Sequence, residues 1–173
     1  MSATYDVQTY LLDRANIHDT VFKLMQSFDE VDTPKLVNAV YAPKVHLDYT
    51  AIMGGEPQHL ESEVWAKSLE PIHSAYEATQ HVVQDLLIEL PQPTGKSKPR
   101  PNSCTAICVG DAKFYRRNGD GLPCVMERRT GGRYDLELVR VPELEEKGEN
   151  PWRISKQTVK LSVMDLGAAP EAK

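Results

Sequence analysis

Three side chains in the sequence could take part in acid–base chemistry within an apolar setting. His81 begins the run HVVQDLLIEL, whose β-branched and leucine-rich residues end at a proline and predict a buried strand. Tyr49 lies in the alternating segment KVHLDYT on the face of two apolar residues, so its ring is expected to point inward. Asp29 falls at the C-terminal end of a predicted helix, where a carboxylate opposes the helix dipole.

Together these residues could act as a general acid–base catalyst. An imidazole changes its protonation near neutral pH, a carboxylate can orient it, and a tyrosine hydroxyl can donate to an oxygen that gains charge. Each residue also has a structural interpretation. His81 would be a core histidine bonded to the backbone, Asp29 the end of a fraying helix, and Tyr49 a core tyrosine bonded to a carbonyl. The residue types alone leave both interpretations open.

The elements that must position these side chains are predicted from the spacing of apolar residues. A helix that starts after Asp13 as its N-cap carries apolar residues at helical intervals, and strand-like runs follow one another after residue 79. The predicted helices are 14–29, 34–41 and 60–69. The predicted strands are 44–50, 79–90, 104–116, 124–141 with a bulge near Gly131–Gly132, and 152–164.

Helices followed by consecutive strands predict an α+β fold, in which a curved, mostly antiparallel sheet wraps over the helices. Such a sheet encloses a cone-shaped pocket. The residues able to line it are Asp29, Tyr49, His81 and one face of the segment RYDLELV.

The length of 173 residues predicts a single domain, residues 1–173. Residues 92–103 belong to a stretch with four prolines and three basic residues, which predicts a mobile loop that can be replaced without loss of stability. Residues 166–173 are expected to form a flexible tail.

Composition excludes several classes of function. The 20 basic and 25 acidic residues give a net charge of −5, which argues against a nucleic-acid-binding surface. No apolar run approaches the roughly 20 residues of a membrane-spanning helix, and the start of the chain lacks the pattern of a signal peptide. The three cysteines, Cys104, Cys108 and Cys124, are interpreted as free thiols in a reducing compartment, so we expect a cytoplasmic protein.

The sequence contains no phosphate-binding loop, no dinucleotide fingerprint and no cluster of metal ligands, so no cofactor is expected. The other histidines are assigned to the surface. His46 is placed on the polar face of its strand, and His59 in a turn.

Five segments of the chain resemble the SnoaL-like and scytalone-dehydratase-like members of the nuclear-transport-factor-2-like fold. They are LLDRANIHDTVFKLMQSFDEVD, KVHLDYT, ATQHVV, GGRYDLELVR and WRISKQTV, and they occur in the same order at plausible spacing between about residues 10 and 163. The resemblance implies the cone-shaped fold of that superfamily. Its members include dehydratases, polyketide cyclases, epoxide hydrolases, isomerases and non-catalytic binding modules.

The resemblance to scytalone dehydratase also implies roles for single residues. His81, in the same T-Q-H context, matches the catalytic histidine, and Asp29 matches the aspartate that positions it. Tyr49 matches a tyrosine that helps to hold a water against the substrate carbonyl. Asp135 falls where that family has an asparagine in contact with the substrate.

The sequence departs from the pattern of scytalone dehydratase in three places. Phe28 stands where a second tyrosine is expected, and Arg133 where a serine is expected. The strand 104–116 lacks the second catalytic histidine, and Lys113 or Tyr115 would occupy that region. These residues are therefore expected to bind substrate, and the substrate is not expected to be scytalone itself.

The resemblance thus implies a cofactor-independent dehydratase, cyclase or isomerase that tailors a polyketide or terpenoid in secondary metabolism. It also implies a small-molecule substrate and a homodimer or homotrimer. Two alternatives stay open. One is an epoxide hydrolase or isomerase with an Asp–Arg–Asp arrangement of Asp29, Arg133 and Asp135; the other is a binding module without chemistry.

Overall fold

The computed structural model describes residues 5–93 and 99–167, with the backbone alone at residues 73, 74 and 124. The helical elements are α1 (Val7–Glu30), α2 (Thr33–Lys35), the π-helical turn η1 (Leu36–Val40), α3 (Thr50–Met53), α4 (Ser62–Ser74) and α5 (Pro142–Glu145). The strands are β1 (Tyr41–Asp48), β2 (Gln58–Glu61), β3 (Ala78–Glu89), β4 (Ser103–Arg117), β5 (Pro123–Arg140) and β6 (Trp152–Asp165).

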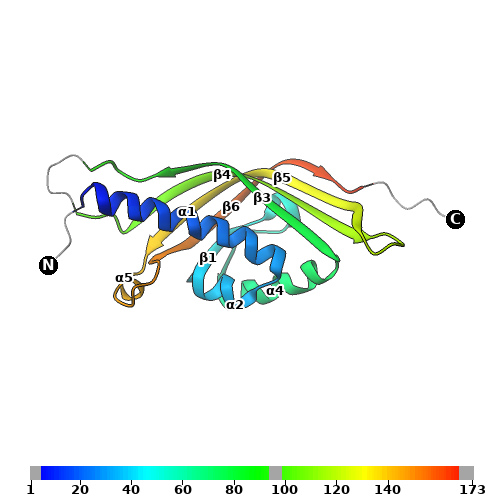
Figure 1. The fold of residues 1–173 in the computed structure, drawn as a ribbon, viewed down its shortest axis with the longest axis horizontal. Coiled ribbons are helices and arrows are strands. Elements are labelled where there is room, and N and C mark those ends of the chain that lie inside the picture. The colour runs from blue at the N-terminus through cyan, green and yellow to red at the C-terminus, as the bar shows by residue number, and fades with distance from the viewer. Residues whose placement is uncertain (1–4, 94–98, 168–173) are drawn as a thin grey trace.

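The strands form one sheet in the order β2-β1-β6-β5-β4-β3. Neighbouring strands are antiparallel except for β1 and β6, which run parallel. Figure 1 shows the sheet as a long curved layer with α1, α2 and α4 on one side of it. The core between the two layers contains Ile17, Val21 and Leu24 of α1 and Leu136, Leu138 and Ile154 of the sheet. The predicted α+β class with a curved, mostly antiparallel sheet is confirmed.

The longest described helix, α1, begins at Val7 rather than after Asp13. Its N-cap is Asp6, whose carboxylate accepts a hydrogen bond from the Thr9 amide at 2.8 Å. The helix ends at Val31, which adopts a left-handed conformation with φ 53°. The last turn thereby presents Asp29 towards β3. Neither α1 nor any other described helix is both long and apolar enough to cross a membrane.

The helix α4 continues through Pro71 to Ser74, beyond its predicted end at residue 69. A proline near the end of a helix removes only one backbone hydrogen bond, and the last turn persists here. The extension matters because it carries Ile72 to the wall of the cavity described below.

The bulge predicted near Gly131–Gly132 is present between β5 and β6. The register moves from Gly131 opposite Val163 to Gly132 opposite Leu161, so the extra residue, Ser162, belongs to β6. The side-chain alternation of β5 therefore runs uninterrupted through the two glycines.

Gly132→Ala is expected to destabilise the protein by about 1–3 kcal/mol, the usual effect of overpacking. A Cβ at this position would lie 2.1 Å from the backbone oxygen of Lys160, so β5 and β6 would have to separate. Gly119→Ala is the control, because nothing lies within 4 Å of its added Cβ. Urea denaturation of both variants measures the difference, and equal unfolding free energies would contradict the expectation.

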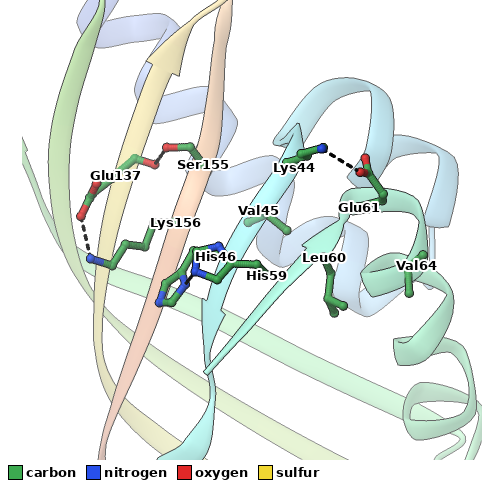
Figure 2. Close-up of a pocket in the computed structure, with 10 residues that line it drawn as sticks. All are labelled: Lys44, Val45, His46, His59, Leu60, Glu61, Val64, Glu137, Ser155 and Lys156. Atoms are coloured by element: carbon green, nitrogen blue, oxygen red, sulfur yellow. Dashed lines mark hydrogen bonds and ion pairs between the residues drawn. The ribbon is translucent and has the colours of Figure 1, made fainter. Parts of the chain in front are cut away.

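The short strand β2 was not predicted, and it changes the assignment of His59 from a turn to a strand. The sequence QHLE has no apolar run, but it pairs with β1 at the edge of the sheet and places His59 opposite His46. Figure 2 shows the two imidazoles in contact, with His46 Nδ1 and His59 Nε2 2.8 Å apart.

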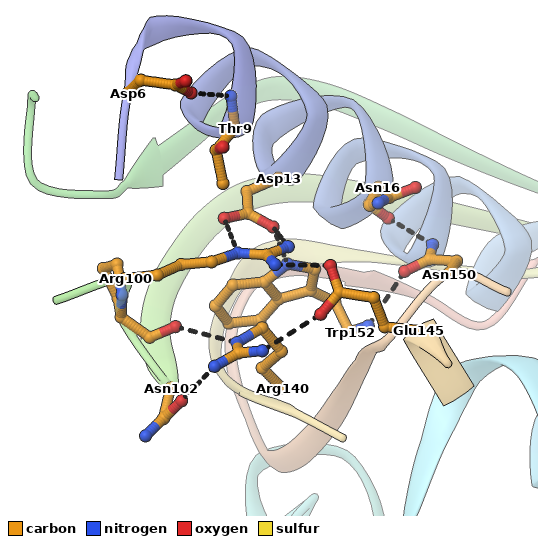
Figure 3. A network of polar contacts seen from close by, with 11 residues as sticks. Asp6, Thr9, Asp13, Asn16, Arg100, Asn102, Arg140, Glu145, Asn150 and Trp152 are labelled. Atoms are coloured by element: carbon orange, nitrogen blue, oxygen red, sulfur yellow. Dashed lines mark hydrogen bonds and ion pairs between the residues drawn. The ribbon is translucent and has the colours of Figure 1, made fainter. Parts of the chain in front are cut away.

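The loop around residue 100 is fixed to the helix layer by a buried ion pair (Figure 3). The Arg100 guanidinium donates to both carboxylate oxygens of the fully buried Asp13, from Nε at 2.9 Å and from Nη2 at 2.6 Å. Arg100 also pairs with Glu145, and the Trp152 indole donates to Asp13 at 2.8 Å.

This ion pair corrects one part of the loop prediction. Residues 94–98 lie outside the described residues, so their predicted mobility stays a prediction. We therefore expect that replacing the whole segment 92–103 would lower stability, because removal of Arg100 would leave the buried Asp13 carboxylate without its cation.

Candidate active site

A cavity of about 210 Å³ lies between the helices and the inner face of the sheet. Apolar side chains make up most of its wall, and the polar groups come from a tyrosine before α3, a histidine on β3 and three residues of β5. Its lining residues are Phe28, Tyr49, Ile52, Met53, Leu69, Ile72, His81, Ala112, Phe114, Arg128, Thr130 and Tyr134. At about 30 Å³ per water molecule, the volume corresponds to roughly seven waters, which suits a molecule of one or two rings.

His81 lines this cavity and is hydrogen-bonded to Asp29, which lies outside the lining. The His81 Nδ1 atom lies 2.7 Å from Asp29 Oδ1. The backbone amide of His81 donates to both carboxylate oxygens at 3.0 Å, and the Thr79 hydroxyl donates to Oδ1 at 2.9 Å. The end of α1 and the start of β3 are thus joined through one carboxylate.

These donors keep Asp29 ionised. Burial of the carboxylate raises its pKa, but the hydrogen bonds from the His81 ring, the His81 amide and Thr79 lower it by more, so the pKa of Asp29 lies below its ordinary value. The carboxylate accepts from Nδ1, which fixes the ring orientation, so any proton exchange with a ligand would use the other ring nitrogen, Nε2.

The imidazole of His81 is enclosed by aromatic rings. Its centroid lies 5.2 Å from that of Phe28 and 5.6 Å from that of Phe114, the latter in an edge-to-face arrangement. The His81 side chain is 7% exposed, whereas that of Asp29 is 30% exposed. The imidazole therefore has few orientations open to it, as a proton-transfer group requires.

Tyr49 lies just beyond the end of β1, at the start of α3, and still reaches the cavity. The buried Gln157 amide donates to its hydroxyl oxygen at 2.6 Å, and Tyr41 donates to the other end of the same amide at 2.7 Å. Burial raises the pKa of Tyr49 well above its ordinary value, so the hydroxyl stays protonated. A hydrogen bond with the Tyr41 hydroxyl also raises the pKa of Tyr49, so a ligand that accepts the Tyr49 proton would compete with Tyr41 for it.

Asp29 reaches the cavity only through His81, and four other predicted site residues are not brought to it. In β5 the side chain of Tyr134 faces the cavity, so its neighbours Arg133 and Asp135 face the other side of the sheet. There Asp135 pairs with Arg133 at 2.5 Å and with Lys160 at 2.7 Å.

The same alternation places Lys113 and Tyr115 of β4 outside the cavity, beside the lining residues Ala112 and Phe114. Lys113 pairs with Asp111 at 3.5 Å. The Asp–Arg–Asp arrangement of an epoxide hydrolase is therefore not assembled from the predicted residues, and the correction follows from strand geometry alone.

Sequence reasoning missed the residues from the first half of β5. Arg128 and Thr130 lie on the cavity face with Tyr134, because these positions are separated by even numbers of residues along an uninterrupted strand. Counting backwards in twos from Tyr134 would have found them. The sequence analysis expected a bulge in β5, which would have interrupted the alternation between Tyr134 and these two residues. The extra residue of this bulge lies in β6 instead.

A larger groove of about 770 Å³ lies at the other face of β1 and contains the His46–His59 contact (Figure 2). It is open, and its carboxylates Glu61 and Glu137 are paired with lysines. Among the described residues, no group of three or more His, Cys, Asp or Glu side chains could hold a metal ion. The apolar cavity with the Asp29–His81 pair is the better candidate for chemistry.

The family model of the SnoaL-like domain matches residues 9–158, so the chain belongs to the SnoaL-like domain family. No curated protein sequence matches it. The predicted nuclear-transport-factor-2-like fold is confirmed by solved structures.

The Kfla4162 protein of Kribbella flavida is 20% identical, with a TM-score of 0.72 over 92% of this chain and 95% of the other. A scytalone dehydratase candidate from Novosphingobium aromaticivorans is 15% identical, with a TM-score of 0.67 over 95% and 93% of the two chains. A hexachlorocyclohexane dehydrochlorinase from Novosphingobium barchaimii is 12% identical, with a TM-score of 0.65 over 95% and 99%. At these identities the likeness concerns the fold.

Proposed function

We propose that this protein is a cofactor-independent acid–base enzyme of the dehydratase, cyclase or isomerase type, with His81 as the group that moves the proton. The supporting observation is the 2.7 Å contact between His81 Nδ1 and the ionised Asp29 at the wall of an apolar cavity. A histidine held in this way can act as a base and return the proton as an acid.

In a dehydration, His81 Nε2 would take a proton from the carbon next to a carbonyl group of the substrate. The released electron pair forms a carbon–carbon double bond as a hydroxyl group leaves the adjacent carbon. The imidazolium returns its proton to that hydroxyl, so water is released and His81 becomes neutral again. Tyr49 donates to the carbonyl oxygen while it gains charge, and Asp29 stabilises the transient imidazolium.

Two further observations support an elimination. The description of the SnoaL-like domain family names no reaction. Two proteins of the same fold, however, are named for eliminations: a dehydratase and a dehydrochlorinase. The wall around His81 is mostly apolar, which strengthens electrostatic interactions with a bound molecule. The volume favours a polyketide or terpenoid skeleton of one or two rings over a larger one.

Proton abstraction can be tested without knowledge of the natural substrate. The wild-type protein and His81→Ala would be incubated in D₂O with cyclic β-hydroxyketones of one or two rings, with and without a ring carboxylate. NMR would follow deuterium exchange next to the carbonyl, and absorbance would follow formation of the conjugated product. We expect exchange that depends on His81; ligand binding without exchange would favour the binding-module alternative.

We further propose a homodimer, with a homotrimer second. The strands carry exposed apolar side chains that a partner could cover, including Leu87, Val109, Val163 and Met164, which are between 38% and 55% exposed. Light scattering of the purified protein is expected to give twice the chain mass. A monomer at high micromolar concentration would contradict this expectation.

A further inference from the structure

Arg128 is the permanently charged residue in the wall of the cavity. It lies on β5 on the same face as Thr130, and its guanidinium carbon lies 5.8 Å from the centre of the Phe114 ring. Since Phe114 also packs edge-to-face against His81, the guanidinium and the imidazole share one aromatic neighbour. A ligand in the cavity would meet both groups.

The Arg128 side chain is partly buried, and its guanidinium has no counter-ion among the described residues. Its Nε atom is inaccessible to solvent and forms no hydrogen bond. Within residues 5–93 and 99–167, no carboxylate pairs with Arg128, whereas Arg100, Arg129 and Arg133 each pair with an aspartate. A cation that has lost part of its water contact, with one buried donor left unpaired, favours an anion that enters the cavity.

The shape and lining of the cavity select the kind of anion. A guanidinium presents a planar fork of donors that matches the two oxygens of a carboxylate. The remaining wall is mostly phenyl and aliphatic, so a bare inorganic ion would leave it unfilled. A phosphate group would call for more cations than the single arginine that the described lining provides. The matching ligand is an organic carboxylate on a ring of modest size.

We infer that Arg128 binds a carboxylate carried by the substrate, so that the enzyme acts on small cyclic carboxylic acids. The inference rests on the proposed function in that it names the substrate class for the same cavity. Arg128 would hold the carboxylate, and the rest of the ring would lie against the apolar wall beside His81.

The test compares acids with their neutral, nearly isosteric amides. Benzoate with benzamide, and 1-naphthoate with 1-naphthamide, would be titrated into wild type, Arg128→Gln and Arg133→Gln at neutral pH by calorimetry. Arg133→Gln is the matched control, because Arg133 lies on the other face of the same strand. Thermal melting and amide binding show whether Arg128→Gln keeps its fold.

We expect wild type and Arg133→Gln to bind an acid at least about tenfold more tightly than its amide, a difference of about 1.4 kcal/mol. Arg128→Gln should lose this preference while its affinity for the amides is unchanged. Equal affinity for acid and amide in wild type, unchanged acid binding in Arg128→Gln, or no acid binding at millimolar concentration would overturn the inference. Because no proton is transferred, the result is independent of whether His81 proves catalytic.

Discussion

Replacement of His81 by alanine is expected to lower the turnover number by roughly 10²- to 10⁴-fold while the protein still folds, since this is the usual contribution of a positioned proton-transfer group. Asp29→Asn should cost less, because the imidazole would remain but lose the negative charge that favours its protonated form. Tyr49→Phe should cost least, about 1–3 kcal/mol in the barrier, the effect of one polar contact left unmade.

The order of these three effects follows from placing the proton transfer on His81 and only supporting roles on Asp29 and Tyr49. Steady-state kinetics on the substrate found by the exchange assay would measure it, with thermal melting as the check on folding. Asp135→Asn is the control, because Asp135 pairs with Arg133 and Lys160 away from the cavity. A larger loss in Asp135→Asn than in His81→Ala would reverse the assignment of the site.

Arg100→Ala is expected to destabilise the protein by about 3–5 kcal/mol, the usual effect of removing one partner of a buried ion pair. Asp13 is fully buried, and Arg100 supplies two of its hydrogen bonds. At about 2–4 °C per kcal/mol for a chain of this size, the melting temperature should fall by roughly 6–20 °C.

Two control variants show whether the loss of stability comes from the buried ion pair. One removes an exposed ion pair, and the other changes the loop but keeps Arg100. Lys67→Ala removes the exposed Glu63–Lys67 pair, whose atoms lie 2.8 Å apart, and should cost only about 0.3–0.5 kcal/mol. Replacement of residues 94–98 by a Gly-Ser segment that keeps Arg100 should leave the unfolding free energy nearly unchanged. If Arg100→Ala cost no more than Lys67→Ala, the buried pair would not fix this loop.

The sequence was most informative where a residue type conflicted with its local setting. Asp29 at a helix end and His81 in an apolar strand were recognisable because neither helps its own element, and the structure joins them. The apolar periodicity of α1 and of β3 to β6 predicted these elements, with errors mainly at their ends. The strand β2 could not be predicted, since its four residues are ordered by pairing with β1 and not by an apolar pattern.

The errors at the site and in the loop came from two different sources. Arg133 and Asp135 were assigned to the cavity through a family resemblance, although alternation with the buried Tyr134 and Leu136 places them on the other face. That error could have been avoided from the sequence. The partner of Arg100 could not have been found in this way, because Asp13 lies 87 positions earlier and nothing local links the two.

The parallel pairing of β1 with β6 has a consequence for the order in which the chain can fold during synthesis. In the sheet, β1 and β2 are joined to the other strands only through β6, which follows all the other described strands in the chain. Until β6 leaves the ribosome, β1 and β5 each present an unpaired edge, and such edges invite pairing with other chains. A chain that stops before Trp152 should therefore aggregate instead of forming a smaller stable sheet.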